Sequence, residues 1–382
     1  MSKQESKSWN NVPFKTWEYE EQTKMKHRVL SYYFPQWLQI LGKWNKGLNY
    51  IDGFGGIGAY HTKKDIEANK YLSNNFGSPV VAALQIKKLI ENSKIGKASI
   101  VIIDEDKGNI QNLKEVLGYN KVNTENIQFI EGNFDQEINR ILDSFEKEVK
   151  SLAPTFFLID PFGFSQVKME TIARILKQPK SEIIINFMYN AIQRWVSHPN
   201  PKLQIHYDNL FGCKEWKKYI GKRTDEKERY LVSLFRKQCK EYGKAKFVYP
   251  FRLSFPDKDM PYYYLFHLCN HQLGCIRFKD SFAKFNIGDL EYKGNGFKQE
   301  SLFKPLEKNQ KREIFIDNLL SKLKRKKISY GSLLNLIIDE CDFLESGIKK
   351  ILQELEKSGI IKIDGNGRTR KGGIDNSDII IF

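Results

Sequence analysis

Five apolar segments between residues 48 and 187 alternate with amphipathic segments, and this alternation restricts the fold more than any other feature. Each apolar segment has the length of a buried strand, and apolar residues at helical spacing follow it. Such alternation predicts a parallel, doubly wound sheet with helices on both faces. The expected strands are LNYID (48–52), ASIVIID (98–104), the strand and turn NIQFIEGNF (126–134), TFFLID (155–160) and EIIINF (182–187). The expected helices span residues 77–93, 107–119, 136–152 and 166–178, the first with Ser78 as its N-cap and Pro79 in its first turn.

Two further features flank this core. Residues 18–45 have helical spacing that is interrupted at Pro35, because proline lacks a backbone N–H. Residues 245–255 and 261–270 have the composition of neighbouring strands joined by a short polar turn. They predict an antiparallel pair at the edge of the parallel sheet. The expected fold class is therefore α/β, a doubly wound Rossmann-like sheet with antiparallel edge strands.

The C-terminal residues have a different pattern. Three helices are expected, at residues 310–326, 330–340 and 344–359, followed by strands IIKID and DIIIF around the basic segment GNGRTRKGGIDNS. Three helices and a basic hairpin are typical of a winged helix-turn-helix. The glycine-rich, polar composition before them predicts a linker. We therefore expect a larger domain at 1–290, a linker at 291–305 and a small domain at 306–382.

Charge and composition narrow the class of partner. The chain of 382 residues has 62 Lys and Arg against 46 Asp and Glu, a formal net charge of +16. Such an excess favours a polyanionic partner, most commonly nucleic acid, over a merely soluble basic surface. The sequence shows no secretory signal and no apolar run long enough to span a membrane, and its five dispersed cysteines favour a reducing compartment. The expected location is cytoplasmic, without membrane contact.

A glycine-rich loop follows the first strand. The segment YIDGFGGIGAY has the pattern D-x-F-x-G-x-G from Asp52 to Gly58, and a loop directly after a strand is the context in which such glycines bind a nucleotide. An acid at the start of the loop repels a pyrophosphate but suits the cationic methionine moiety of S-adenosyl-L-methionine. We therefore expect that cofactor rather than NAD. The expected contacts from the loop are Asp52, Phe54, Gly55, Gly56 and Gly58.

The second strand ends in IIDED, which places carboxylates where ribose hydroxyls are held in dinucleotide-type folds. Asp104 and Glu105 are the candidates. Asp104 lies 46 residues after Gly58, whereas the dehydrogenase fingerprint has its acid about 20 residues on. This departure also argues against a dehydrogenase. In the alternative interpretation, Asp52 only caps a turn and the glycines only shape it.

The segment FFLIDPFGF ends the fourth expected strand at Asp160. Its position predicts that Asp160 lies beside the crevice where doubly wound sheets bind ligands. A carboxylate and a rigid carbonyl near Pro161 would orient an exocyclic amine toward a methyl donor, and Phe162 or Phe164 would stack on a base flipped from its strand. The expected catalytic residues are Asp160, Pro161 and Phe162. The alternative is a strand terminus with core aromatics.

These motifs resemble the three-Cys-motif partner family (TcmP). The resemblance covers about residues 15–290 through YIDGFGGIGAY, GSPVVAAL, VIIDED, LIDPFGF and EIIINFMYNAIQRW, and the C-terminal unit resembles the winged helix of some members. It implies a class I methyltransferase sheet, S-adenosylmethionine as cofactor and a three-Cys-motif protein as a partner. It also implies that Asn133 and Phe134 of EGNF lie at the adenine of the cofactor, where many relatives have an acid instead of Asn133.

The acceptor motif departs from that of the adenine amino-methyltransferases. These enzymes have D-P-P-Y or a close variant, whereas Phe162 and Gly163 occupy the third and fourth positions here. The stacking aromatic is thus displaced by one position. The expected target is a base amino group, with adenine left open.

Several other groups have two interpretations. His267, Cys269, His271 and Cys275 suit zinc by residue type, but the first three fall along one expected strand, so an alternating face of an edge strand is favoured and no metal is expected. Asn186, Asn190 and Arg194 either border the acceptor pocket or decorate a helix. Lys26 and His27 either reach the methionine carboxylate or lie on a solvated helix face, which is favoured.

Basic residues of the C-terminal unit are the expected nucleic-acid contacts. Lys349 and Lys350 fall on the third helix, in the recognition position, and Arg368, Arg370 and Lys371 fall in the wing. The alternative is a winged helix that binds protein.

Two functions remain open at this point. The first is an S-adenosylmethionine-dependent methyltransferase acting on nucleic acid, which the acids Asp52, Asp104 and Asp160 favour. The second is a catalytically silent scaffold or sensor that retains the cofactor pocket and binds nucleic acid or a protein partner, which the displaced aromatic favours.

Overall fold

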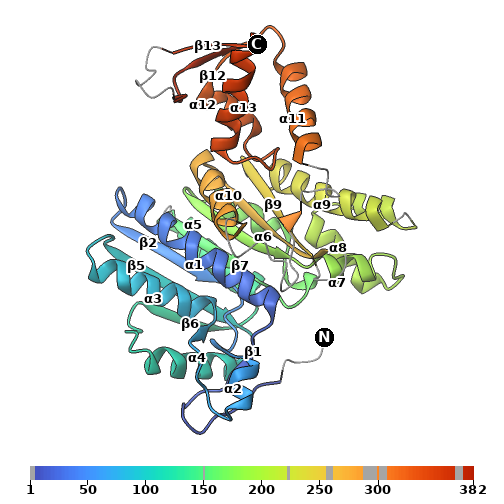
Figure 1. Cartoon of the computed structure of the whole chain (residues 1–382). Helices are drawn as coiled ribbons and strands as arrows, with labels where there is room; N and C mark the ends of the chain where they lie inside the picture. Colours follow the sequence, from blue (N-terminus) through green and yellow to red (C-terminus); the bar gives the residue numbers. More distant parts are fainter. Residues whose placement is uncertain are drawn as a thin grey trace.

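An eight-stranded sheet forms the centre of the larger domain (Figure 1). The computed structural model describes residues 5–148, 151–221, 224–254, 261–286, 299–300, 308–365 and 373–382. Across the sheet the order is β11-β9-β10-β8-β7-β2-β5-β6. The strands are β2 (Gly47–Asp52), β5 (Lys97–Asp104), β6 (Ile127–Glu131), β7 (Thr155–Ile159), β8 (Ser181–Phe187), β9 (Phe247–Ser254), β10 (Pro261–Cys269) and β11 (Gln299–Glu300).

The order and the direction of the strands distinguish this sheet from a dehydrogenase sheet. Strands β6, β5, β2, β7 and β8 are parallel, and β10 runs antiparallel to both β8 and β9. Counted from β2, the order is 3-2-1-4-5-7-6, whereas the dinucleotide-binding order is 3-2-1-4-5-6. The antiparallel pair expected from the sequence is confirmed, but β10 lies inside the sheet rather than at its edge.

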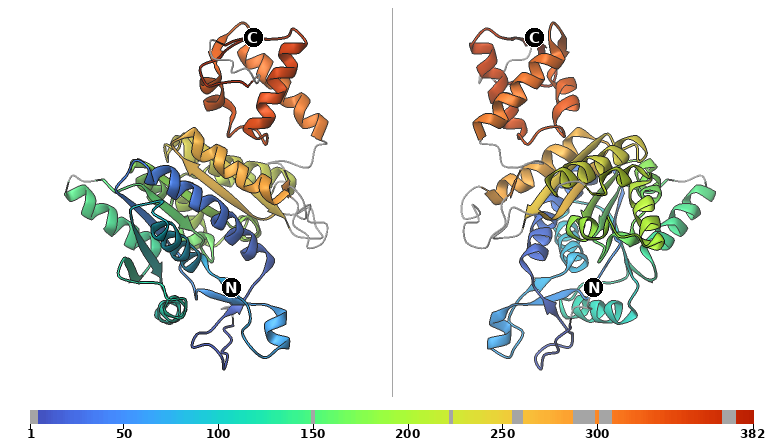
Figure 2. Two further views of the ribbon diagram at one scale, coloured as in Figure 1. Left: turned by 60° about the vertical axis from the view of Figure 1, so that its left-hand side comes forward. Right: turned by 90° about the vertical axis from the view of Figure 1, so that its right-hand side faces the viewer.

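Helices cover both faces of the sheet (Figure 2). One face has α1 (Glu21–Gly42), α3 (Ser78–Glu91), α4 (Lys107–Tyr119) and α10 (Gln272–Asn286). The other has α5 (Phe134–Lys147), α6 (Met169–Lys177), α7 (Tyr189–Trp195), α8 (Pro201–Phe211) and α9 (Thr224–Glu241), with short 3-10 turns at Phe164–Gln166 and Glu215–Tyr219. Successive strand residues enter opposite cores, as Tyr50 and Ile51 do. The doubly wound arrangement expected from the alternating segments is thus present.

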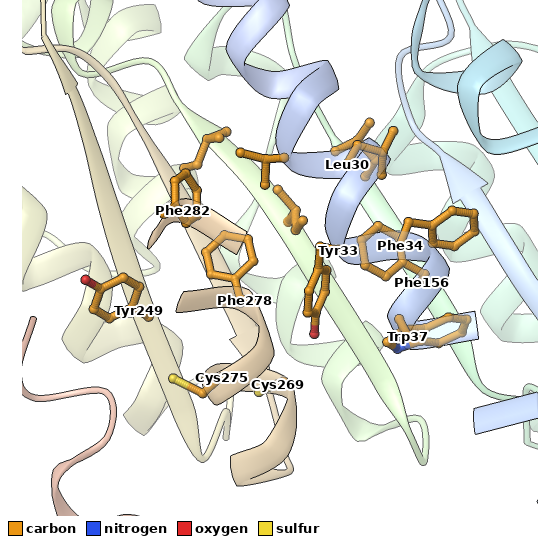
Figure 3. Packing of buried hydrophobic residues seen from close by; sticks show 14 of the residues in the cluster. Leu30, Tyr33, Phe34, Trp37, Phe156, Tyr249, Cys269, Cys275, Phe278 and Phe282 are labelled. Carbon is orange, nitrogen blue, oxygen red and sulfur yellow. The ribbon is translucent and has the colours of Figure 1, made fainter. Parts of the chain in front are cut away.

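Aromatic side chains join α1 to the sheet and to α10. Figure 3 shows Tyr33, Phe34 and Trp37 of α1 beside Phe156 of β7, with Phe278 of α10 on the other side of Tyr33. Tyr33 and Phe278 meet edge to face, with ring centroids 5.5 Å apart. This packing fixes α1 along β7, which matters for the site below.

Pro35 does not interrupt α1, contrary to the expectation from the sequence. The proline removes the hydrogen bond that the Ser31 carbonyl would otherwise accept within the helix. Gln85 of α3 supplies a substitute, because its Nε2 donates to the Ser31 carbonyl oxygen at 3.0 Å. This contact from α3 therefore satisfies the free carbonyl group, and α1 continues through Pro35.

The residues between the glycine loop and α3 form a small sheet of their own. It contains β1 (Trp17–Glu18), β3 (Ala59–His61) and β4 (Asn75–Phe76), in the order β1-β3-β4, with α2 (Lys63–Glu67) between β3 and β4. Ser78 is the first residue of α3 rather than its N-cap, which is Gly77. The Ser78 side chain is instead hydrogen-bonded to Asp52.

The C-terminal domain has three helices and a three-stranded sheet. Its elements are α11 (Lys308–Leu323), β12 (Lys327–Ser329), α12 (Tyr330–Ile337), α13 (Glu345–Lys357), β13 (Lys362–Asp364) and β14 (Ile379–Ile381), and the sheet order is β12-β14-β13. The three expected helices and two strands are present, and β12 is an addition. Most of the expected linker lies outside the described residues, and the division into domains at 290 and 305 stays a prediction.

Buried charged groups dock this small domain on the larger one. Lys279 of α10 is 3% exposed, and its Nζ donates to the carbonyl oxygens of Ile338 (2.8 Å), Cys341 (2.8 Å) and Phe343 (2.6 Å). Asp339 is 2% exposed and accepts from the Val248 N–H at 2.9 Å, and its carboxylate lies 2.7 Å from Lys240 Nζ. These contacts fix the connection between α12 and α13 against β9, α9 and α10 (Figure 1).

No described helix is long and apolar enough to cross a membrane.

The docking contact can be tested with Lys279→Met. The variant leaves three buried carbonyl oxygens without their donor, so we expect the free energy of unfolding to fall by about 2 kcal/mol or more in urea denaturation. Arg277→Met is the control on the same helix, because Arg277 forms only an exposed ion pair with Asp280 and its loss should cost within about 0.5 kcal/mol. Equal stability of the two variants would contradict the role given to Lys279.

Candidate functional site

The order of the strands reverses between β2 and β7. From β2 the chain continues to β5 and β6 on one side, and then returns to β7 and β8 on the other. In doubly wound sheets, ligands bind in the crevice outside the carboxyl ends of the strands at such a switch point. In the pairing of β2 with β7, Asp52 lies opposite Leu158, and Asp160 comes two residues after Leu158. The structure thus brings Asp52 and Asp160 to the same crevice.

Backbone hydrogen bonds hold the glycine loop between the neighbouring strands. The Gly53 N–H donates to the Leu158 carbonyl oxygen at 2.9 Å, and the Gly55 N–H donates to that of Ile103 at 2.9 Å. A Cβ on Gly55 would lie 2.4 Å from Ile102 Cγ2, and Gly58 has φ +86°. Glycine is required at both positions, because the loop lies directly on β5 at the first and turns left-handed at the second.

Asp52 is fully buried at the start of this loop. Its Oδ2 accepts from the Tyr50 hydroxyl at 2.7 Å, its Oδ1 accepts from the Phe54 N–H at 3.2 Å, and Ser78 also bonds to it. Burial raises the pKa of Asp52 to about 6, although these three donors lower it. Asp52 forms no ion pair with a basic residue of the described chain. The carboxylate is therefore held in a site that would favour a cation.

Asp104 holds the glycine loop through hydrogen bonds to its carboxylate. Its Oδ2 accepts from the Gly56 N–H at 2.7 Å, and its Oδ1 accepts from the Asp106 N–H at 2.8 Å and from Asn109 Nδ2 at 3.1 Å. Burial raises the pKa of Asp104. Both carboxylate oxygens are thus engaged with the protein, and Glu105 is the exposed acid at this strand end.

Asn133 lies beside Glu105, and Phe134 packs against the glycine loop. Asn133 Nδ2 donates to Glu105 Oε1 at 2.6 Å, and its Oδ1 caps α5 by accepting from the Asp135 N–H at 3.0 Å. Phe134 is buried, with its ring centroid 5.3 Å from that of Phe54. The expected cofactor contacts from three separate segments therefore surround one strand end.

Asp160 forms an ion pair that the sequence did not indicate. Lys26 Nζ of α1 bonds to Asp160 Oδ2, and Asn186 Nδ2 at the end of β8 donates to Asp160 Oδ1 at 2.7 Å. The Lys26 side chain is 16% exposed, and His27 is buried with its Nδ1 3.1 Å from the Tyr19 hydroxyl. The favoured interpretation of these two residues as a solvated helix face is therefore wrong. Burial, and then the charge of Lys26, lower the pKa of His27 to about 3, while the Asp160 carboxylate acts in the opposite direction.

A pocket opens beside Asp160, between α1 and the ends of β7 and β8. Polar and apolar side chains share its lining, among them Lys26, His27, Ser78, Leu158, Asp160 and Asn186. Asn186 is 4% exposed, and its Oδ1 has no hydrogen-bond partner among the described residues. The pocket thus has an anionic carboxylate and an unpaired amide oxygen near each other.

Aromatic rings continue from this pocket across the mouth of the crevice. Phe162 is 48% exposed and meets Trp17 edge to face, with ring centroids 5.9 Å apart. Trp17 in turn contacts Tyr60 at 6.3 Å, and Tyr60 contacts Tyr19 at 5.0 Å. Pro161 is buried, and Phe164 packs on Tyr207 at 4.7 Å, away from this series. Of the two aromatics considered for stacking, Phe162 is the exposed one.

Tyr60 is a site residue that sequence reasoning missed. Burial raises the pKa of its hydroxyl, and the carboxylates of Asp160 and Asp52 raise it further, so the group is neutral and lies near both acids. Tyr60 belongs to β3, in the segment inserted after the glycine loop. The sequence around Tyr60 does not indicate a site residue, because only the pairing of β3 with β1 brings Tyr60 to the crevice.

The remaining candidates lie in different surroundings. Asn190 and Arg194 fall on α7, where Asn190 is half-buried and Arg194 is exposed. His267 and Cys269 are buried on β10, and Cys275 is buried on α10. Figure 3 shows the two cysteines. His267, Cys269 and Cys275 do not alternate along an edge strand, because β10 has neighbours on both sides. Among the residues that the structure describes, no group of His, Cys, Asp or Glu could hold a metal ion.

The expected nucleic-acid contacts are described in part. Lys350 of α13 is exposed, whereas Lys349 lies 3.0 Å from Glu345 in an ion pair and 5.2 Å from the Tyr330 ring centroid. Arg368, Arg370 and Lys371 lie outside the described residues.

Comparison with known proteins identifies the small domain. The family model described as the GMT-like wHTH domain matches residues 289–367. None of the curated proteins has a significantly similar sequence. Together with the mixed, mainly parallel, doubly wound sheet, this match confirms the expected fold class, an α/β sheet with a C-terminal winged helix-turn-helix.

Among solved structures, three illustrate the range of similarity. The SAM-dependent methyltransferase from Agrobacterium tumefaciens is 12% identical, with 71% of each chain covered and a TM-score of 0.37. A Legionella pneumophila protein is 11% identical over 72% of this chain and 96% of its own, with a TM-score of 0.41. An rRNA methylase from Streptococcus thermophilus is 10% identical over 62% and 92%, with a TM-score of 0.29. Scores this low assign no activity to the chain.

The raised pKa of Asp52 predicts a dependence of stability on pH. The folded state holds the Asp52 proton more tightly than the unfolded state, so stability is lost as pH rises from 3.8 through about 6. We expect the wild type to lose stability relative to Asp52→Asn across this window, with a constant difference above about pH 7. Urea denaturation of both proteins at a series of pH values measures the difference, and parallel profiles would show that Asp52 is not perturbed.

Proposed function

We propose that the chain is an S-adenosylmethionine-dependent methyltransferase that acts on nucleic acid, at an amino group of a base. One observation carries the proposal: the glycine loop with its buried Asp52 and the pocket beside Asp160 meet at the switch point of a methyltransferase-type sheet. The first is suited to a cationic nucleoside cofactor and the second to an amine.

The residues at the loop fit the proposed cofactor. A buried carboxylate with a raised pKa and only neutral donors around it would gain from an ammonium group, which the methionine moiety provides. Glu105 is the exposed acid available for ribose hydroxyls, and Asp104 holds the loop that follows Asp52. Phe54, Phe134 and Asn133 would border the adenine. When bound, S-adenosylmethionine supplies a methyl group from its sulfonium.

The pocket beside Asp160 supports an amine as acceptor. The ammonium of Lys26 already bonds to Asp160 Oδ2, which shows that this oxygen accepts from a nitrogen donor. Asn186 Oδ1 has no hydrogen-bond partner among the described residues and would accept a second N–H. Holding both N–H groups leaves the nitrogen lone pair free to face a methyl donor, so that alignment replaces a strong base. The nitrogen loses one proton as its bond to the methyl group forms, and Asp160 or water takes up that proton.

Three observations support nucleic acid as the substrate: the net charge of the chain, an exposed aromatic ring and the C-terminal domain. The net charge is +16, the matched family model is a winged helix-turn-helix, and Phe162 presents an exposed ring beside the pocket. A base turned out of its strand would stack on Phe162, while its exocyclic amine reaches Asp160. Lys26 has to leave Asp160 for this to occur.

Membership of the three-Cys-motif partner family belongs to the same proposal. The GSPVVAAL, LIDPFGF and NFMYNAIQRW segments support it, and they contribute Ser78, Asp160 and Asn186 to one pocket. A three-Cys-motif protein as partner is the corresponding expectation.

A second candidate is a scaffold that binds the cofactor without catalysis. The observation that favours it is the engagement of both Asp160 oxygens, one by Lys26 and one by Asn186. If Lys26 does not leave, Asp160 is a structural acid that secures α1 to β7. Turnover measurements separate the two candidates, as described below.

Cofactor binding can be tested with Gly56→Val. Gly56 has φ +63°, and a Cβ there would lie 3.1 Å from Trp17 Cζ3, so a branched residue should distort the loop and abolish S-adenosylmethionine binding in calorimetry. Gly47→Val at the start of β2 is the control, because a Cβ there meets nothing within 4 Å. Binding of NAD by the wild type, without binding of S-adenosylmethionine or its demethylated product, would refute the cofactor assignment.

The acceptor site can be tested with Asp160→Asn and Asp160→Ala. A positioned acceptor contributes mainly in the transition state, so we expect turnover to fall roughly a hundredfold or more while cofactor affinity stays near that of the wild type. The readout is transfer of a labelled methyl group to total nucleic acid. Asp143→Asn is the control, because Asp143 forms an exposed ion pair with Arg174.

The same assay separates the enzyme from the scaffold. Lys26→Met frees Asp160 for an acceptor, so the enzyme hypothesis predicts retained or increased turnover in this variant. Unchanged turnover in both Asp160 variants would show that Asp160 is not catalytic. No turnover in the wild type, with intact cofactor binding, would establish the scaffold.

A further inference from the structure

The helix-turn-helix connection of the small domain is not available to nucleic acid. In such motifs the second helix, here α13, enters the major groove with its N-terminal residues at the base edges. The residues just before α13 are bound instead to the larger domain, because Lys279 holds the carbonyl oxygens of Ile338, Cys341 and Phe343. Asp339 of the same connection is bound by Arg236 and Lys240. The segment that leads into α13 therefore lies against the larger domain.

Charge at the start of α13 points the same way. Glu345 lies in its first turn and pairs with Lys349 at 3.0 Å, so the lysine that would face a phosphate is already neutralised. A carboxylate at this position would repel a phosphate backbone. Reading of base edges by the first turn of α13 is thus disfavoured both by sterics and by charge.

A different part of the small domain carries unpaired positive charge. Five of the six residues 322–327 are basic, and we call them the basic corner: Lys322, Lys324, Arg325, Lys326 and Lys327. All five are exposed, and none forms an ion pair with an acid among the residues that the structure describes. They cover the end of α11, a left-handed turn at Arg325 with φ +60°, and the first residue of β12. The turn fixes the cations on a short, rigid feature.

The basic corner lies at the end of the small domain that faces away from the larger one. The Phe382 N–H donates to the Lys326 carbonyl oxygen at 3.0 Å, and Lys327 pairs with Ile381, so the corner lies beside the C-terminus. Figures 1 and 2 show the C-terminus at the far end of the small domain in each view. The 16 residues of α11 span about 24 Å between the docked side and this corner.

We infer that the basic corner binds the phosphate backbone of a double-stranded nucleic acid, as an anchor remote from the pocket at Asp160. A duplex carries one negative charge per about 1.7 Å of its axis, and clustered cations that neutralise it gain from released counterions. Cations on a helix end and a strand contact phosphates without reading bases. The inference rests on the nucleic-acid part of the proposed function and names the surface that makes the contact.

An anchor of this kind explains how the small domain contributes to substrate binding. Because Lys279 and Asp339 hold the small domain in one place, a duplex on the basic corner lies at a fixed distance from the pocket. The contact is independent of sequence, so it positions a long substrate, and specificity is left to the larger domain. An acidic protein surface has a lower charge density and is the competing occupant, which the test below separates.

The test uses the full chain without cofactor and measures fluorescence anisotropy of a labelled 30-base-pair duplex, about three helical turns, over a range of salt concentrations. The variant is Lys322→Gln, Lys324→Gln and Lys327→Gln together. The control is Lys88→Gln, Lys94→Gln and Lys97→Gln, three exposed lysines of the larger domain with the same loss of net charge. Circular dichroism confirms that both fold. DNA and RNA duplexes of one sequence are the two arms.

We expect the corner variant to bind roughly tenfold or more weakly, equally for unrelated sequences, with a salt slope smaller by about 3. The control, and Lys349→Gln with Lys350→Gln, should keep the wild-type slope. Wild-type affinity and slope in the corner variant would overturn the inference while leaving the nucleic-acid function intact, and so would an equal loss in the control. A wild type that binds neither duplex would overturn both, and would leave an acidic protein as the occupant to be sought.

Discussion

The parallel pairing of β2 with β7 is the contact on which the arrangement of the site depends. It sets Asp52 opposite Leu158, and therefore sets the distance along the sheet from Asp52 to Asp160. The Gly53 N–H extends the same ladder to the Leu158 carbonyl oxygen, so the glycine loop begins in a fixed direction. Because the strand order reverses at this pair, no helix connects the two strand ends, and the crevice between them is open to ligands.

Two sets of buried charged groups in the described residues have different surroundings. Asp339 and Lys279 find complete sets of partners between the domains, and such groups fix one arrangement because losing a partner is costly. Asp52 is buried with neutral donors only, which leaves its pKa raised to about 6. A fully matched buried charge serves structure, whereas one that lacks a counter-charge is the place to expect a ligand.

The strand and helix alternation made the larger domain predictable, since each apolar segment of five to nine residues contained a strand close to its expected bounds. The acids at the strand ends followed from the same pattern, because parallel strands bring their carboxyl ends to one edge. Lys26 could not be predicted, because it meets Asp160 across 134 residues through the aromatic packing of α1. Tyr60 required the pairing of β1 with β3, and the docking of Asp339 required the whole of α9, β9 and α10.

The central claim is that Asp52 holds a cationic group of the cofactor, and calorimetry at pH 6 in buffers of different ionisation enthalpy tests it directly. About half of Asp52 is protonated at this pH if its pKa is about 6, and an ammonium beside it would lower that pKa. The account predicts that S-adenosylmethionine binding releases about half a proton at pH 6, and that Asp52→Asn removes this release. Binding without proton release, or with the same release in Asp52→Asn, would contradict it.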